Sequence, residues 1–98
     1  MAWTYIVECA DGSYYVGSTV DLDGRLWQHN NSPDGAAYTR VRRPVRLVWA
    51  AQFDRVDEAF AFEKRVQGWS RAKRRALIDG NFTALPGLSR RGHLRPTN

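Results

Sequence analysis

The chain has 98 residues, a length that allows one compact domain and excludes a large modular enzyme. Hydrophobic residues make up 43% and charged residues 26%, a composition typical of a folded globular domain rather than a disordered chain. Fifteen Lys and Arg against ten Asp and Glu give a net charge of +5, which favours an acidic partner.

Two strands joined by a tight turn are predicted first. Residues 3–9 and 13–18 are rich in aromatic and β-branched side chains, as strands are. Residues 10–12 between them contain an Asp-Gly pair, which is typical of a hairpin turn. We therefore expect an antiparallel hairpin at the start of the chain.

The length of this turn decides how two tyrosines face each other. A three-residue loop with Gly12 in the left-handed conformation would pair Tyr5 with Gly17 and place Tyr5 and Tyr15 on one face. A two-residue loop would shift the register by one residue and place the tyrosines on opposite faces. The sequence leaves both registers open, and both tyrosines also fit as ordinary strand formers.

A helix is predicted from the capping residues 19–21 to about residue 30. Its Leu22, Leu26 and His29 are spaced for one face. Arg25 and His29 lie four residues apart, so both can project toward one point. There a guanidinium could stabilise charge on a phosphoryl group and an imidazole could relay a proton; a solvated helix face is the alternative.

A polar loop over residues 30–44 is expected next, and it is the segment that we expect to be most mobile. It ends in a basic run formed by Arg40, Arg42 and Arg43. Residues 45–53 are mostly apolar and predict a buried strand that completes a small sheet.

Two further helices are predicted, one from an N-cap at Asp57 to Gln67 and one from an N-cap at Ser70 to about residue 79. The fold class is therefore α/β, in the α+β sense, with a mostly antiparallel three-stranded sheet flanked by helices in the order β-β-α-β-α-α. Residues 1–80 form the predicted domain, and residues 81–98 form a basic C-terminal tail.

One carboxylate on the first of these two helices is a candidate metal ligand. Glu63 lies among Phe60, Phe62 and Val66, on a helix that must pack much of its surface. Magnesium commonly uses one or two carboxylates together with water and substrate phosphate. A surface glutamate that lies along the helix is the alternative.

The positive charge lies almost entirely after residue 39. Residues 1–39 carry five acids and one base, a net charge of −4, whereas residues 40–98 carry fourteen bases and five acids, a net charge of +9. This concentration favours nucleic acid as the partner, although a solvated basic surface without a specific ligand would look the same. No apolar stretch is long enough for a membrane helix and no signal peptide is recognisable, so we expect a cytoplasmic protein without membrane contact.

Taken together, the motifs resemble the GIY-YIG nuclease superfamily, in its small single-domain, UPF0213-like bacterial branch. Tyr5 ends the first motif, in which Trp3 and Thr4 replace the glycine and isoleucine that give the family its name. The second motif stands ten residues later as Tyr15-Val16-Gly17. The resemblance continues through Asp21, Arg25, His29, the segment 35–39, Arg43-Pro44, Glu63 and the segment 68–71.

The resemblance implies metal-assisted hydrolysis of phosphodiester bonds in nucleic acid, with DNA as the expected substrate. Glu63 would hold Mg²⁺ or Mn²⁺, Arg25 would stabilise the developing charge, and a tyrosine, Tyr15 before Tyr5, would help to activate water with His29 as helper. The expected nucleic-acid contacts are Gly17, Tyr38, Arg40, Arg42 and Arg43. The chain is expected to be a monomer. The alternatives are a non-catalytic nucleic-acid-binding module and a protein-interaction adaptor.

Overall fold

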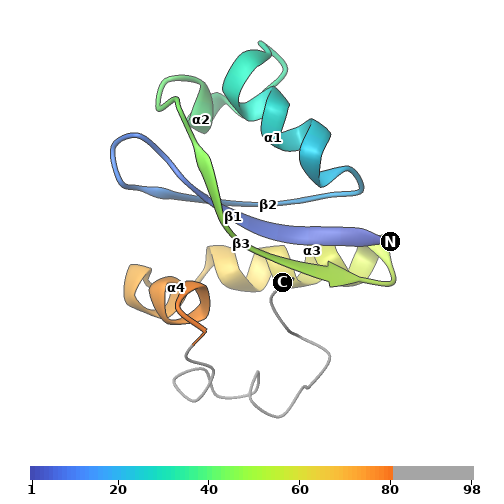
Figure 1. Cartoon of the computed structure of the whole chain (residues 1–98). Coiled ribbons are helices and arrows are strands. Elements are labelled where there is room, and N and C mark those ends of the chain that lie inside the picture. Colours follow the sequence, from blue (N-terminus) through green and yellow to red (C-terminus); the bar gives the residue numbers. More distant parts are fainter. Residues whose placement is uncertain (81–98) are drawn as a thin grey trace.

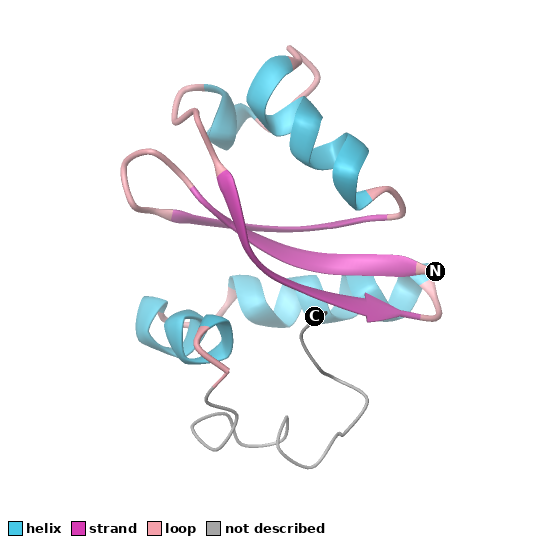
Figure 2. Ribbon diagram, viewed as in Figure 1, coloured by secondary structure: helices cyan, strands magenta, loops and turns pink. Residues whose placement is uncertain are grey.

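A three-stranded antiparallel sheet carries helices on both faces, α1 and α2 on one and α3 and α4 on the other (Figures 1 and 2). The computed structural model describes residues 1–80, so the predicted basic tail over 81–98 lies outside the described residues. The strands lie in the spatial order β2-β1-β3. The elements are β1 Ala2–Glu8, β2 Tyr14–Thr19, α1 Leu22–Asn31, α2 Ala37–Arg40, β3 Arg46–Phe53, α3 Val56–Gln67 and α4 Arg71–Ile78.

The hairpin adopts the register of the three-residue loop. Tyr5 pairs with Gly17, and the Cys9 N–H donates to the Ser13 carbonyl at 2.8 Å. Gly12 has a φ of 84°, in the left-handed region that favours glycine. Side chains alternate between the two faces of a strand, so Tyr5 and Tyr15 lie on the same face of the sheet.

Each face of the sheet covers its own apolar core. On the α3 and α4 side the buried cluster includes Ile6, Trp49, Phe62, Val66 and Leu77. On the α1 side a smaller cluster is formed by Tyr5, Val7, Cys9, Val45 and Ala50, with Leu22 and Leu26 of α1 packed against it. Successive residues of β1 point to opposite faces of the sheet, so odd-numbered residues such as Tyr5 and Val7 pack under α1 and even-numbered ones such as Ile6 pack against α3 and α4.

Of the three predicted helix N-caps, two are confirmed and one is wrong. The Asp21 side chain accepts from the Gly24 N–H at 3.1 Å, and the Ser70 hydroxyl accepts from the Lys73 N–H at 3.2 Å. By contrast, α3 has its N-cap at Arg55 rather than at Asp57. The Asp57 carboxylate pairs with the Arg55 guanidinium at 2.9 Å and lies in the first turn, where an acidic side chain is also favourable.

The segment 30–44, predicted as a continuous loop, contains the short helix α2. The helix has four residues and no side-chain N-cap hydrogen bond, so it leaves neither a periodic pattern nor a capping signal in the sequence. The order is therefore β-β-α-α-β-α-α, and the predicted α+β class with a three-stranded sheet is confirmed. No helix within residues 1–80 is long and apolar enough to cross a membrane.

Candidate active site

A chain of hydrogen bonds links β1, α1 and α2 on one face of the sheet. The Tyr5 hydroxyl lies 2.6 Å from His29 Nε2, and His29 Nδ1 lies 2.9 Å from the Thr39 hydroxyl. The Thr39 hydroxyl donates to the Ala36 carbonyl at 3.0 Å, so it accepts from Nδ1–H. Nε2 is then the acceptor, and Tyr5 donates its proton to His29.

The buried positions of Tyr5 and His29 fix their protonation states at neutral pH. Burial lowers the pKa of His29 to about 4, and the charges of Arg25 and Arg43 act in the same direction. Burial raises the pKa of Tyr5 to about 12, against a lowering by Arg25. The pair therefore consists of a neutral imidazole and a protonated phenol that are hydrogen-bonded to each other.

We expect stability to depend on pH through His29. The unfolded chain takes up a proton at His29 near pH 6.5, whereas the folded protein does so only near pH 4. The contribution of the neutral His29 to the free energy of unfolding is thus fully present above pH 6.5 and is lost as the pH falls from 6.5 to about 4. Urea unfolding at pH 7, 6, 5 and 4.5 should show a steeper loss of stability for the wild type than for His29→Gln. Equal slopes would contradict a buried neutral His29.

Gly17 makes room for the Tyr5 hydroxyl. A Cβ atom at position 17 would lie 2.5 Å from Tyr5 Oη and 2.7 Å from Tyr5 Cζ. Gly17 was predicted as a nucleic-acid contact, but the structure places it in the buried layer directly against the Tyr5 ring. Its missing side chain positions the first tyrosine.

Gly17→Ala should displace the Tyr5 ring and lower stability by roughly 1–3 kcal/mol, as expected when a buried site is overpacked. The urea midpoint and the Tyr5 hydroxyl or His29 ring NMR signals would report both effects. Gly68→Ala is the matched control, because a Cβ there would meet its nearest atom, the Arg65 carbonyl oxygen, at an ordinary 3.5 Å. A stable Gly17→Ala protein with unchanged His29 signals would show that the close contact is not required.

Arg25 projects from α1 beside the pair. Its Nη1 donates to Gln28 Oε1 at 2.9 Å and to the Asp34 carbonyl at 3.3 Å, and its charge acts on the pKa of both Tyr5 and His29. None of the ion pairs among residues 1–80 involves Arg25. The side chain borders a hollow of about 560 Å³ that Asp21 and Asp34 also line, although neither carboxylate is within ion-pair distance of the guanidinium.

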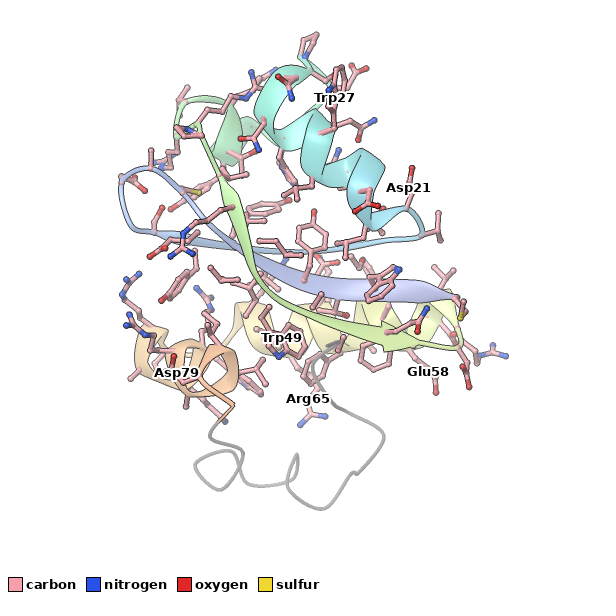
Figure 3. All side chains as sticks on the ribbon, viewed as in Figure 1. Asp21, Trp27, Trp49, Glu58, Arg65 and Asp79 are labelled. Carbon is pink, nitrogen blue, oxygen red and sulfur yellow. The ribbon has the colours of Figure 1, made fainter. Side chains whose placement is uncertain are left out.

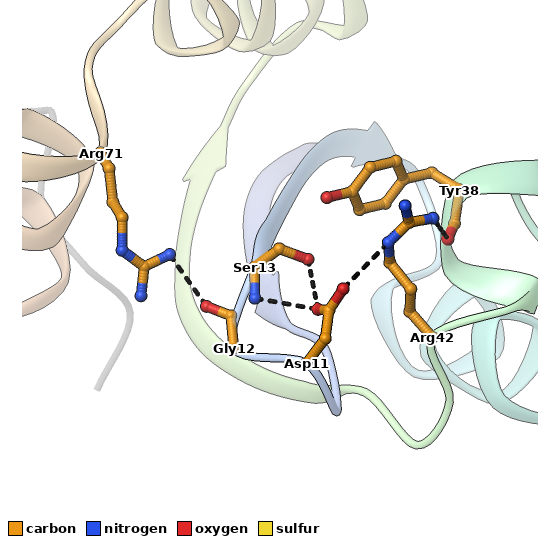
Figure 4. A network of polar contacts seen from close by, with 6 residues as sticks. All are labelled: Asp11, Gly12, Ser13, Tyr38, Arg42 and Arg71. Carbon is orange, nitrogen blue, oxygen red and sulfur yellow. Dashed lines mark hydrogen bonds and ion pairs between the residues drawn. The ribbon is translucent and has the colours of Figure 1, made fainter.

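Tyr15 and Tyr38 form an aromatic wall next to His29. Their ring centroids lie 6.1 Å apart in a stacked arrangement, and the Tyr15 and His29 rings form a T-shaped pair with centroids 5.2 Å apart. Tyr38 is 39% exposed, and the Arg42 guanidinium lies 3.9 Å from the centre of its ring. Arg42 also pairs with Asp11 at 3.1 Å (Figure 4). The wall is therefore only partly exposed, because the Arg42 guanidinium lies over the Tyr38 ring and Tyr15 stacks against it.

The three arginines of the predicted basic run have different surroundings. Arg43 donates to the carbonyls of His29 and Ser32 at 2.6 Å each and to that of Gln28 at 3.2 Å, which holds the end of α1. Arg40 is exposed and donates only to the Pro33 carbonyl, at 3.0 Å. Arg40 and Arg42 thus have N–H groups left for a ligand, whereas the Arg43 guanidinium is engaged within the protein.

Glu63 lies on the opposite face of the sheet from Tyr5, on α3. It is 8% exposed; Ser18 Oγ donates to its Oε1 at 2.6 Å and Gln67 Nε2 donates to its Oε2 at 2.7 Å. Ser18, whose hydroxyl binds Glu63, directly follows Gly17, which packs against the Tyr5 ring. Tyr5 and Glu63 therefore lie beside neighbouring residues of β2, on opposite faces of the sheet.

The surroundings of Glu63 fit a site with a single carboxylate ligand. Within residues 1–80 no group of three or more His, Cys, Asp and Glu side chains could hold a metal ion together. Two neutral donors orient the Glu63 carboxylate, and each of its oxygens retains a lone pair. The half-exposed Lys64 ammonium lies 3.8 Å from Oε2, so a bound cation would compete with this loose ion pair. Such a site suits Mg²⁺ or Mn²⁺ held by one carboxylate, water and a substrate phosphate.

Comparison with known proteins places this arrangement in a family. The sequence profile described as the GIY-YIG catalytic domain matches residues 1–76. The chain belongs to the GIY-YIG family. The residues that carried the resemblance, from Tyr5 to Glu63, all lie within the matched range.

Within the family the chain groups with the UPF0213 proteins. It is 45% identical to the UPF0213 protein of Staphylococcus saprophyticus over 78% of this chain and 92% of that protein. It is 46% identical to the UPF0213 protein of Halobacterium salinarum over 80% of this chain and all of that protein. The solution NMR structure of a UPF0213 protein from Bacillus halodurans is 44% identical, with a TM-score of 0.52 over 81% of this chain and 84% of that one.

Three residues of this GIY-YIG site were missed by the sequence analysis. Thr39 sets the His29 tautomer, and Ser18 and Gln67 hold Glu63. The spacing of Gln67 four residues after Glu63 on one helix was a usable signal. Thr39 and Ser18 reach their partners only through the tertiary fold, from 10 and 45 positions away.

Proposed function

We propose that this GIY-YIG domain hydrolyses phosphodiester bonds in nucleic acid, with DNA as the expected substrate. The observation that carries the proposal is the 2.6 Å hydrogen bond from the Tyr5 hydroxyl to the neutral His29 ring. This bond holds the Tyr5 oxygen, the proposed proton acceptor, in place beside Arg25. Glu63 is bound by Ser18, the residue after the Gly17 that packs against Tyr5, so the groups that we propose for acid-base chemistry and for metal binding lie beside the same stretch of β2.

In this proposal the Tyr5 and His29 pair handles the proton of the attacking water. A proton taken up at the Tyr5 oxygen is balanced by release of the phenol proton to His29 Nε2, and Nδ1–H stays bonded to Thr39. Tyr15, the preferred candidate from the sequence, forms a T-shaped ring contact with His29 and has no hydrogen bond to it among the described residues. We therefore assign the proton transfer to Tyr5 and the aromatic wall to Tyr15.

The other groups act on charge. Arg25 would bind a nonbridging phosphate oxygen and stabilise the additional negative charge that develops as water attacks. Glu63 would hold Mg²⁺ or Mn²⁺, which when bound supplies Lewis-acid activation of the phosphate. Arg40 and Arg42 would contact neighbouring backbone phosphates, and the partly exposed Tyr38 ring, with the Arg42 guanidinium over it, would line the path of the strand.

The decisive experiment incubates the purified chain with labelled single-stranded, duplex and branched DNA and RNA, with Mg²⁺, with Mn²⁺ and with EDTA. We expect cleavage of at least one substrate in the presence of metal and none in EDTA, while binding persists in EDTA. Binding of the substrates without cleavage of any would instead establish a nucleic-acid-binding module and reject the catalytic proposal.

A further inference from the structure

The outer edge of β2 carries a hollow that joins the two faces of the sheet. It has a volume of about 270 Å³ and is lined by Tyr14, Tyr15, Val16, Tyr38, Gln67 and Arg74. Tyr15 and Tyr38 belong to the face with α1 and α2, whereas Gln67 and Arg74 come from α3 and α4 on the other face. A ligand strand in this hollow would therefore contact both layers.

Two arginines of α4 stand beside the hollow, and Tyr14 connects them to it. The Arg71 guanidinium lies 4.4 Å from the centre of the Tyr14 ring and donates to the Gly12 carbonyl at 2.8 Å (Figure 4). Arg75 Nη1 lies 3.4 Å from the Tyr14 hydroxyl. A guanidinium has five N–H donors, so both exposed arginines retain several for a ligand.

The charge of these two arginines is barely neutralised. Arg71 takes part in none of the ion pairs found among residues 1–80, and Arg75 faces Asp79 at 3.6 Å with both side chains well exposed. Arg74 is different, because it donates to the Val66 and Gln67 carbonyls and holds the end of α3. The surface formed by Arg71 and Arg75, here called the α4 patch, is thus preorganised by Tyr14 and the β1–β2 turn.

We propose that the nucleic acid crosses the outer edge of β2 and that the α4 patch binds its backbone phosphates on the opposite face from Tyr5 and His29. The inference rests on the proposed function for the nature of the ligand. It adds a second binding surface, contributed by α4, that was not among the nucleic-acid contacts predicted from the sequence. It also implies a substrate long enough to reach both faces, with the scissile phosphate near the β2 edge.

The test measures binding in EDTA of a fluorescent DNA that the chain binds, over a range of salt concentrations. For Arg71→Gln/Arg75→Gln we expect the slope of log K against log salt to become shallower by about 2, one for each lost phosphate contact. Counterion release alone then corresponds to a loss of affinity of roughly 30-fold at 0.15 M salt. An unchanged slope would overturn the proposal.

The matched control is Arg55→Gln/Arg65→Gln, which removes the same charge from α3 and its N-cap. Arg55 pairs with Asp57, and Arg65 points away from the sheet (Figure 3). An equal loss of affinity in this control would show that only overall basicity matters and would overturn the α4 patch. If the glutamine variant has a clearly lowered melting temperature, Arg71→Lys/Arg75→Lys is measured in its place. The lysine variant should fold and retain most of the salt dependence of binding. A lost salt dependence despite the retained charge would contradict the phosphate assignment.

Binding of DNA duplexes of different lengths tests whether the nucleic acid crosses the edge of β2. For duplexes of increasing length, the affinity of the wild type should rise more steeply than that of Arg71→Gln/Arg75→Gln, because only longer DNA reaches both faces. Parallel length dependences would overturn the crossing of β2. Since binding is measured without metal, an absence of cleavage in the substrate screen would reject the proposed catalysis and leave this result intact.

Discussion

Glu63→Gln should lower metal-dependent cleavage by orders of magnitude while substrate binding changes little. The substitution keeps the size of the side chain and removes the negative charge that a divalent cation requires. The amide oxygen can still accept from Ser18, and the Gln67 amide can turn to offer its own oxygen, so the local packing survives. Turnover, DNA affinity in EDTA and Mn²⁺ binding by calorimetry would be measured for both proteins.

Glu58→Gln is the matched control for this prediction. Glu58 is an exposed acid in the first turn of the same helix, away from β2 (Figure 3). It should leave turnover and Mn²⁺ binding as in the wild type. A folded Glu63→Gln protein that cleaves at the wild-type rate, or that still binds Mn²⁺ with the same affinity, would reject Glu63 as the metal ligand.

Tyr5→Phe should lower cleavage by roughly 10²- to 10⁴-fold, the usual contribution of general acid-base catalysis. The ring stays in place over Gly17, but the proton acceptor is lost. His29 Nε2 also loses its donor, which should cost about 1–3 kcal/mol of stability because a buried acceptor is left unpaired. Single-turnover rates and urea unfolding would separate the two effects.

Tyr15→Phe is the informative comparison for the proton transfer. It removes a hydroxyl from the same face of the sheet and keeps the ring that stacks on Tyr38. We expect a smaller loss of cleavage and no loss of the His29 hydrogen bond. Abolished cleavage in Tyr15→Phe together with wild-type cleavage in Tyr5→Phe would assign the proton transfer to Tyr15.

The sequence predicted the elements of the fold better than the geometry between them. Strand-forming composition and helical spacing located all three strands and three of the four helices, because each signal is local. The hairpin register remained open, since an Asp-Gly pair fits loops of two or three residues. The tertiary contact of Tyr5 with Gly17 is compatible with only the three-residue loop, and such a contact is invisible in a single sequence.

The candidate site shows the same division. The spacing of Arg25 and His29 on one helix predicted that their side chains project to the same side. The two GIY-YIG motifs pointed to Tyr5 and Tyr15. Whether an arginine is available could not be predicted, because Arg43 and Arg40 differ only in how many carbonyls the folded chain presents to them. Charge alone therefore suggested three equivalent arginines, whereas the structure engages the Arg43 guanidinium with three carbonyls and Arg40 with one.

The position of Arg43 at the end of α1 has a consequence for how this region can vary between relatives. His29 lies in the last turn of that helix, where the negative end of the helix dipole favours a protonated imidazole. Arg43 binds three of the carbonyls at this end, and its positive charge lowers the pKa of His29. Burial accounts for most of the lowering of the His29 pKa, and Arg43 adds to it while it satisfies the carbonyls at the helix end. Without Arg43 the pKa of His29 would rise and these carbonyls would lose their donor. We therefore expect positions 29 and 43 to change together among relatives.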